Sequence, residues 1–190
     1  MRYPTVLVTF SLVAMLAGHV LADDFDSNGD IDGKIVTQVV SGDIHISGKI
    51  DGGSRVILIS TNGSIYVDGK IDGGSRVTLK AAQDIHIAST GAADQRRIDG
   101  SSQVAATAGG KIIVGGKIDG ESTVHFRAGS GIDIADKIDN VKSQAFLKTD
   151  TGKIEIHDKV DGGASVFYWP EAALVVDNKV ANAKVIAADW

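Results

Sequence analysis

The segment GKIDGGSRVILISTNGSIYVD at residues 48–68 is followed directly by GKIDGGSRVTLKAAQDIHIAS at residues 69–89. Both segments begin with the same nine residues and then carry β-branched and apolar residues at alternate positions. Alternation with period two is typical of β-strands, and the intervening Gly, Asn and Asp residues are typical of tight corners. A unit of about 20 residues cannot bury its own apolar side chains, so it has to stack on copies of itself.

The isoleucine of the KID phrase marks one position in every copy of the repeat. It recurs, with valine in the last two copies, at Ile31, Ile50, Ile71, Ile98, Ile118, Ile138, Val160 and Val180. The spacings are 19, 21, 27, 20, 20, 22 and 20 residues, so a single step departs from the period. The pattern predicts an all-β, single-domain, right-handed parallel β-helix of about seven to eight three-strand coils with ~20 residues per coil. The right-handed form is favoured because parallel crossovers are right-handed and the hexapeptide period of left-handed β-helices is missing.

Each coil offers five inward-facing positions. In the coil that begins at the KID phrase of the first segment they are Ile50, Val56, Leu58, Ile65 and Val67, and later coils carry apolar residues at the matching places. We expect these columns to form one continuous aliphatic core.

The first 22 residues have the features of a secretory signal peptide. Arg2 precedes an apolar run from Thr5 to Gly18, and small residues place the cleavage site before Asp23. We therefore expect residues 1–22 to be removed and residues 23–190 to form the β-helix domain. The protein would then be secreted or periplasmic, without a membrane span after cleavage.

Composition narrows the classes of function. The formal net charge is −5, there is no cysteine, and Lys and Asp are finely interleaved. A nucleic-acid surface would show a basic patch, so nucleic acid is not an expected partner. Without disulfides, stability in an exported protein has to come from backbone hydrogen bonding and the stacked core.

The repeat is broken in two places. The long step contains ASTGAADQRR at residues 88–97, which predicts a loop that leaves the stack, and residues 168–190 predict a C-terminal cap made of a last half coil with aromatic residues. Such loops either bind ligands or are inert surface. The candidate ligand-binding residues at the loop are Asp84, His86, Asp94, Arg96 and Arg97.

The most regular polar feature is a pair of columns on either side of the marker residue. The cationic column is Lys49, Lys70, Arg97, Lys117, Lys137, Lys159 and Lys179, and the acidic column is Asp32, Asp51, Asp72, Asp99, Asp119, Asp139 and Asp161. We expect lysines to lean across to the acids, and the columns to provide solubility and register. Asp before Gly is also ordinary corner chemistry. The alternative is a repetitive charged surface that matches a polysaccharide or a mineral.

The segment DFDSNGDIDG at residues 24–33 resembles the start of a calcium loop. Oxygen-bearing side chains at alternate positions, with Gly29 at the sixth, are what calcium coordination requires. The twelfth position is Ile35, so the bidentate acid is missing. Calcium is the one candidate cofactor, and its candidate ligands are Asp24, Asp26, Asn28, Asp30 and Asp32.

Two outward-facing columns carry other side chains. The first is His45, Tyr66, His86, Ile113, Asp133, Glu155 and Val175, and the second is Ile57, Thr78, Ala105, His125, Phe146 and Phe167. His45 and His86 lie two coils apart, ~9.6 Å, which is too far for one zinc ion, so a stacked surface column is expected. The strip at Phe146 and Phe167 predicts either a contact surface for a partner or second copy, or burial under the C-terminal tail.

The phrases GKIDGG-x-x-V-x-L and G-x-I-x-I resemble those of secreted parallel β-helix repeat proteins, including filamentous-haemagglutinin-like adhesin shafts. They are also similar to the short β-helices of bactofilins. The resemblance implies a structural or adhesive solenoid, with end-to-end polymerisation as in bactofilins, and it supplies no active-site residue.

The sequence therefore predicts a non-enzymatic, exported structural or adhesive protein. It would act through a repetitive surface on a polysaccharide or cell-surface component, or through self-association at its ends or at the Phe146 and Phe167 strip. The alternative is a carbohydrate-active β-helix enzyme, or a polysaccharide-binding module, that uses the loop at residues 88–97. Ice binding is disfavoured because the faces carry Lys and Asp in place of ranks of Thr.

Overall fold

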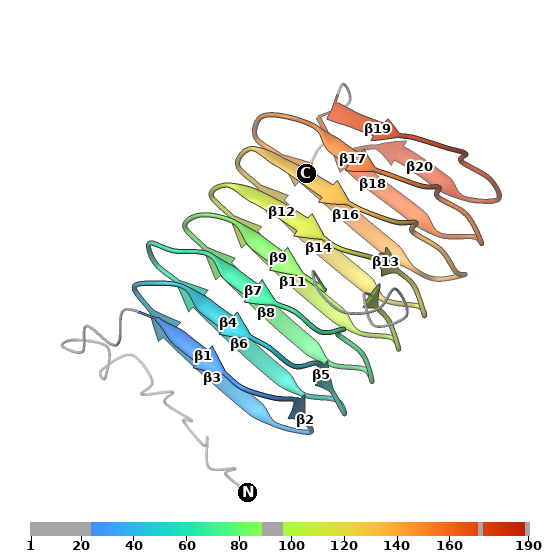
Figure 1. The fold of residues 1–190 in the computed structure, drawn as a ribbon. Helices are drawn as coiled ribbons and strands as arrows, with labels where there is room; N and C mark the ends of the chain where they lie inside the picture. Colours follow the sequence, from blue (N-terminus) through green and yellow to red (C-terminus); the bar gives the residue numbers. More distant parts are fainter. Residues whose placement is uncertain (1–23, 89–96, 171–172, 189–190) are drawn as a thin grey trace, which may run out of the picture.

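The computed structural model describes residues 24–88, 97–170 and 173–188. The chain winds as a stack of similar coils from the N-terminal end to the C-terminal end, with strands of successive coils side by side (Figure 1). All strand pairs are parallel, and two of the sheets contain eight strands each. The predicted β-solenoid of about seven to eight coils is confirmed.

Three faces run along the stack. The first sheet contains β1 (Phe25–Ser27), β4 (Ile44–Ile46), β7 (Ile65–Val67), β9 (Ile85–Ile87), β12 (Lys111–Val114), β15 (Gly131–Ile134), β17 (Ile154–Ile156) and β19 (Leu174–Val176). The second contains β3 (Ile35–Val40), β6 (Arg55–Ser60), β8 (Arg76–Ala81), β11 (Gln103–Ala108), β14 (Thr123–Ala128), β16 (Gln144–Thr149), β18 (Ser165–Trp169) and β20 (Lys184–Ala187). The third face has the short pairs β2 (Ile31–Asp32) with β5 (Ile50–Asp51), and β10 (Arg97–Ile98) with β13 (Lys117–Ile118).

The marker column is continuous through the molecule. Paired strands or isolated parallel bridges join every successive pair of marker residues from Ile31 to Val180. The 27-residue step does not disturb the register, because Ile71 pairs with Ile98 and β8 pairs with β11 along its whole length. The loop expected at residues 88–97 falls mainly on residues 89–96, which lie outside the described residues.

The aliphatic core fills the interior as predicted. Ile50, Val56, Leu58, Ile65 and Val67 are at most 1% exposed, and their equivalents are similarly buried as far as Val166. Towards the C-terminal end the core opens, because Tyr168, Leu174 and Val176 are only partly buried and Val180 is 45% exposed.

A serine column that the hydrophobic pattern did not indicate is buried beside the core, at Ser54, Ser75, Ser102, Ser122 and Ser143. The backbone N–H of each of these serines donates to the carbonyl oxygen of the residue three positions earlier, which closes the corner. The Ser54 hydroxyl also donates to the carbonyl of Asp51, at 2.6 Å.

The corners depend on glycine at a few positions. Gly73 and Gly74 both have positive φ, 62° and 72°, a conformation that L-residues adopt at a cost of about 1–2 kcal/mol. A Cβ on Gly73 would also collide with the Asp51 carboxylate and would lie 2.8 Å from the backbone nitrogen of Gly52 in the preceding coil. A Cβ on Gly74 would meet no atom closer than 3.9 Å. Close stacking of coils therefore requires glycine at the first position of the pair.

The two ends of the described stack have different strands at their edges. At the C-terminal end β20 pairs with β18, so the predicted last half coil forms, although Trp190 lies outside the described residues. At the other end β3 is the edge of the second sheet, and its Ile35 is 82% exposed. The described part of the chain contains no helix with the length and hydrophobicity needed to span a membrane.

We predict that Gly73→Ala destabilises the fold more than Gly74→Ala does. Both alanines carry the strain of positive φ, but only the alanine at position 73 meets backbone of the preceding coil. Urea unfolding followed by circular dichroism should show an additional loss of more than about 1 kcal/mol in the free energy of unfolding for Gly73→Ala. Equal losses in the two variants would contradict this account of the corner.

Candidate functional site

The outward column of the first sheet contains the main candidate residues. The pairing register places Asp26, His45, Tyr66, His86, Ile113, Asp133, Glu155 and Val175 on successive strands in that order. Each is the middle or an outward residue of a strand whose neighbouring residues point into the core. The predicted surface column is thus confirmed, and it begins one coil earlier, at Asp26.

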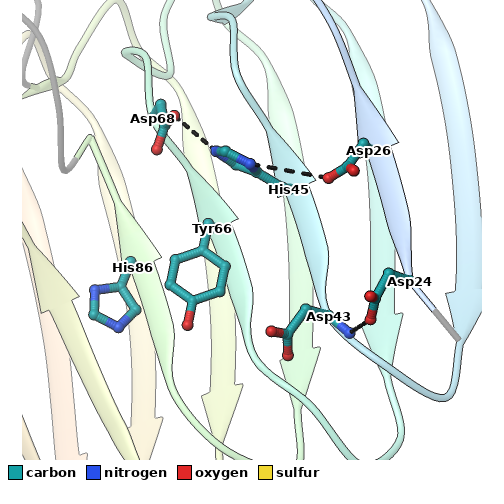
Figure 2. A pocket seen from close by; sticks show the side chains of 7 residues that line it. All are labelled: Asp24, Asp26, Asp43, His45, Tyr66, Asp68 and His86. Atoms are coloured by element: carbon teal, nitrogen blue, oxygen red, sulfur yellow. Dashed lines mark hydrogen bonds and ion pairs between the residues drawn. The ribbon is translucent and has the colours of Figure 1, made fainter.

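The N-terminal part of this column lines a shallow groove of about 660 Å³, which we call the aromatic groove. Figure 2 shows its side chains, which come from β1, β4, β7, β9 and the adjoining corners. The lining residues are Asp24, Asp26, Asp43, His45, Tyr66, Asp68 and His86. Four of these are aspartates, so the groove favours cationic or hydrogen-bond-donating ligands.

Two rings of the groove are stacked on each other. The ring centroids of Tyr66 and His86 lie 4.9 Å apart and their planes differ by 21°. Figure 2 shows these two rings side by side with a face of each turned toward the viewer. The His45 ring stands edge-on to Tyr66, with centroids 6.1 Å apart and an interplanar angle of 75°.

Acidic partners fix the His45 ring on both sides. Its Nε2 lies 2.7 Å from Oδ2 of Asp68, and its Nδ1 lies 3.9 Å from Oδ1 of Asp26 (Figure 2). The Asp26 and Asp68 carboxylates belong to the coils before and after that of His45. This arrangement holds the imidazole across three coils at the upper edge of the groove in Figure 2.

The other aspartates are positioned by backbone hydrogen bonds between coils. Oδ1 of Asp24 accepts from the backbone N–H of Asp43 at 2.8 Å, and Oδ1 of Asp43 accepts from that of Ser64 at 2.8 Å. Asp84 repeats this contact two coils after Asp43, accepting from the N–H of Lys111 at 2.7 Å. These acids therefore join successive coils while they present charge at the groove.

Three of the five residues predicted at the loop are described, and they lie at different places. His86 lies in the aromatic groove on the first sheet, Asp84 caps the next coil at a corner, and Arg97 lies on the third face, where its Nε is 3.0 Å from Asp99. Asp94 and Arg96 lie outside the described residues. A cleft at the loop base stays a prediction.

The five calcium candidates are laid out along the first coil. Asp24 and Asp30 each accept a backbone N–H of the next coil, and Asp26 faces His45. Asn28 is exposed in the bend between β1 and β2, and Asp32 pairs in register with Asp51. Among the described residues, the acids of this set are not part of a group of three whose ligand atoms lie within 4.8 Å of one another. Calcium binding here stays a prediction.

The cationic and acidic columns form ion pairs within each coil, which we call the Lys–Asp ladder. The nitrogen-to-Oδ2 distances are 2.9 Å for Lys49–Asp51, 2.5 Å for Lys70–Asp72, 3.0 Å for Arg97–Asp99, 2.6 Å for Lys117–Asp119 and 3.0 Å for Lys159–Asp161, and Lys137 pairs with Asp139 in the same way. The other oxygen of each of these aspartates accepts the N–H of the following residue at 2.6–2.7 Å. The expected pairing across columns and the Asp–Gly corner bond are both confirmed.

The ladder also explains the acidity of its carboxyl groups. The hydrogen bond from Lys137 holds the pKa of Asp139 below its usual range, although burial opposes this with a smaller effect. The hydrogen bond from the N–H of Asn140 also lowers the pKa of Asp139. The hydrogen bond from Lys49 likewise lowers the pKa of Asp51. The ladder residues therefore have a structural role that accounts for their regularity.

A second polar cluster lies further along the first sheet and was missed at the level of sequence. Asp133, Glu155 and His157 place one ligand atom each within 4.8 Å of one another, and Asp177 contacts the imidazole from the next coil. The hydrogen bond to Asp177 raises the pKa of His157, against a smaller opposing effect of burial, with further support from the charge of Asp133. We call these four residues the acid–His cluster. The alternation of Asp133 and Glu155 was visible in the sequence, but His157 and Asp177 occupy corner positions just beyond strands β17 and β19.

The predicted aromatic strip forms on the second sheet. The rings of His125 and Phe146 stack at 4.4 Å, and those of Phe146 and Phe167 at 4.9 Å. Both phenylalanines are half-buried. In the tail as described up to residue 188, β20 continues the sheet beside β18 and adds exposed Ile186 next to Phe167, so this part of the tail does not lie over the strip.

Searches against protein families, curated protein sequences and solved structures found no match to this chain.

We predict that the Lys–Asp ladder contributes to stability in a pH-dependent way that Asp139→Asn removes. Because the folded-state pKa of Asp139 lies below its ordinary value of 3.8, its stabilisation is fully present above that value and is lost as pH falls through the lower folded pKa. Asparagine keeps an oxygen for the N–H of Asn140 but loses the charge. Urea unfolding between pH 2 and 6 should show a deficit for the variant at pH 6 that shrinks below about pH 4.

Asp150→Asn is the matched control, since that carboxylate pairs with Arg127 at 3.3 Å in an exposed position where an ion pair contributes about 0–1 kcal/mol. A deficit for Asp139→Asn that stays constant over the whole pH range would exclude the electrostatic explanation.

Proposed function

We propose that this chain is a non-enzymatic, exported β-solenoid that acts as an adhesive protein and binds a hydroxyl-rich polysaccharide through the aromatic groove. The observation that carries the proposal is the stacked ring pair of Tyr66 and His86, bordered by the carboxylates of the groove. Export is supported by the signal-peptide pattern of residues 1–22.

The chemistry of the groove suits sugars. Aromatic faces bind the apolar face of a ring-shaped ligand, and ionised carboxylates can only accept hydrogen bonds, which hydroxyl groups donate. The rings and the acids come from adjacent coils held in register, so they are preorganised for a rigid ligand. A polymer chain can follow the groove along several coils.

Charge selects among polysaccharides. The groove carries the carboxylates of Asp24, Asp26, Asp43 and Asp68. Uronic-acid or sulfated polymers would meet like charge there, whereas neutral or amino sugars would not. We therefore propose a neutral or amino-sugar polymer as the ligand class.

The groove supports binding in preference to hydrolysis. Its lining residues come from one sheet and the adjoining corners, so within the described residues it is an open surface and does not enclose a sugar away from water. The carboxylates of Asp24 and Asp43 are also engaged in backbone hydrogen bonds that hold successive coils. A binding site without catalysis accounts for both features.

We predict that Tyr66→Ala weakens binding to a neutral or amino-sugar polymer about tenfold, since loss of one aromatic contact costs about 1 kcal/mol or more. The panel is soluble β-glucan, xylan and chitin oligosaccharides, with alginate and hyaluronan as acidic comparisons, and the readout is affinity electrophoresis or calorimetry. Phe146→Ala, which removes an aromatic ring from the second sheet, is the control. Failure of the wild type to bind any neutral or amino sugar, or equal loss in both variants, would remove the proposal.

Self-association is a second candidate function, and it is favoured by the edges of the stack. In the described residues β3 and β20 are edge strands with backbone groups open to pairing, and Ile35 and Ile186 are exposed there. The strip of His125, Phe146 and Phe167 offers an alternative lateral contact.

Sedimentation velocity over a concentration series distinguishes these contacts. If the ends associate, Ile35→Lys should shift the protein toward monomer while Phe167→Ser leaves the assembly unchanged, because a lysine on an edge strand opposes pairing. The reverse result would assign the assembly to the strip. A wild type that stays monomeric at the highest concentration would eliminate this function.

A further inference from the structure

In the acid–His cluster, two carboxylates lie directly opposite each other on neighbouring strands. Asp133 on β15 pairs in register with Glu155 on β17, both facing outward. Like charges directly opposite on neighbouring strands are destabilising, so a cation bound between these carboxylates would be stabilising. Since the flanking residues of the same column are Ile113 and Val175, the charge is confined to these two coils of the column.

The ligand atoms have the separation of a metal site. Nε2 of His157 lies 3.3 Å from Oδ1 of Asp133, and one ligand atom from each of Asp133, Glu155 and His157 lies within 4.8 Å of the others. With metal–ligand bonds of ~2.1 Å in tetrahedral geometry, neighbouring ligand atoms are ~3.4 Å apart. Small side-chain rotations would bring all three to that spacing, and the half-buried to exposed positions permit them.

Asp177 orients the imidazole for coordination. Its Oδ2 lies 2.8 Å from Nδ1 of His157, on the opposite side of the ring from Asp133. A carboxylate that holds one ring nitrogen of a histidine fixes the tautomer and directs the other nitrogen, with its lone pair, at the metal. Asp177 is therefore a positioning residue in this arrangement.

We propose that Asp133, Glu155 and His157 bind a divalent transition-metal ion, with zinc as the best fit, and that Asp177 positions His157. Two carboxylates and one imidazole form a ligand set that suits zinc, while calcium takes six to eight oxygen ligands. Three protein ligands leave one tetrahedral position for water or an external group. The metal would join the coils of β15 and β17, and through Asp177 that of β19.

The chain contains its own comparison at His45. Like His157, that imidazole lies between two aspartates, each facing a different ring nitrogen, at 2.7 Å for Asp68 and 3.9 Å for Asp26. In the described residues it is not part of a group of three clustered ligands. The two histidines thus differ in the feature that the proposal requires, which is a second carboxylate on the metal-facing side.

The experiment uses tag-free protein covering residues 23–190, treated with chelator and dialysed, and titrated with Zn²⁺ by calorimetry in the presence of excess Ca²⁺. We expect one ion per chain, with at least a tenfold loss of affinity in His157→Ala and in Glu155→Gln and no change in His45→Ala. Asp177→Asn should weaken binding by about 10–100-fold. Titration with Co²⁺ should give the visible absorption of a tetrahedral site in the wild type and a changed spectrum in Asp177→Asn, which a purely structural role would not produce.

Circular dichroism shows whether each variant is folded. If one variant is not folded, Asp133→Asn, which preserves the size of the side chain, is used in its place. Zn²⁺ that does not bind below millimolar concentration, that binds His157→Ala as it binds the wild type, or that is lost in His45→Ala would overturn the proposal. Because the cluster shares no residue with the aromatic groove, these outcomes are independent of polysaccharide binding.

Discussion

The backbone hydrogen bonds between successive coils are the constraint on which the rest of this structure depends. Each strand pairs in parallel with its equivalent one coil away, so every residue stacks on the residue at the same place in the repeat. The residue type at each position therefore depends on the residues stacked above and below it. Isoleucines stack on isoleucines in the core, and glycine is required where the next coil passes closely. With no cysteine in the chain, the stack is held by these ladders, the aliphatic core and the polar contacts at the corners.

Aspartates at the corners accept backbone hydrogen bonds in two ways, either from their own coil or from the next one. The ladder aspartates accept the N–H of the following residue and pair with the cation two positions earlier. Asp24 and Asp43 accept an N–H of the next coil, and so they carry charge into the aromatic groove from a fixed position. The groove and the acid–His cluster are thus built from the contacts that stabilise the stack, and differ from it only in which side chains face outward.

Much of the fold was predictable because a period of about 20 residues determines both strand positions and register. The marker residues from Ile31 to Val180, the core positions and both outward columns all follow from counting along the repeat. The sites were less predictable because they combine different columns. Sequence reasoning found His45, Tyr66 and His86, and it named Asp24 and Asp26 as calcium candidates, but it did not indicate Asp43 or Asp68. It missed His157 because that residue follows its strand at a corner, where the period-two pattern has ended. The buried serines were missed since a small polar residue at a corner carries no hydrophobic signal.

The uniform stacking of coils places equivalent residues at a constant spacing along the molecule. His86 lies at one end of the groove, and Asp133 lies in the acid–His cluster. Only Ile113 stands between them in the same column, so they are two coil spacings of ~4.8 Å apart. The adjacent segments at residues 48–68 and 69–89 begin with the same nine residues, and their strands β6 and β8 pair in register. The distance between the two sites can therefore change in evolution only by the gain or loss of whole coils. The spacing of the two binding surfaces thus takes only multiples of one coil spacing.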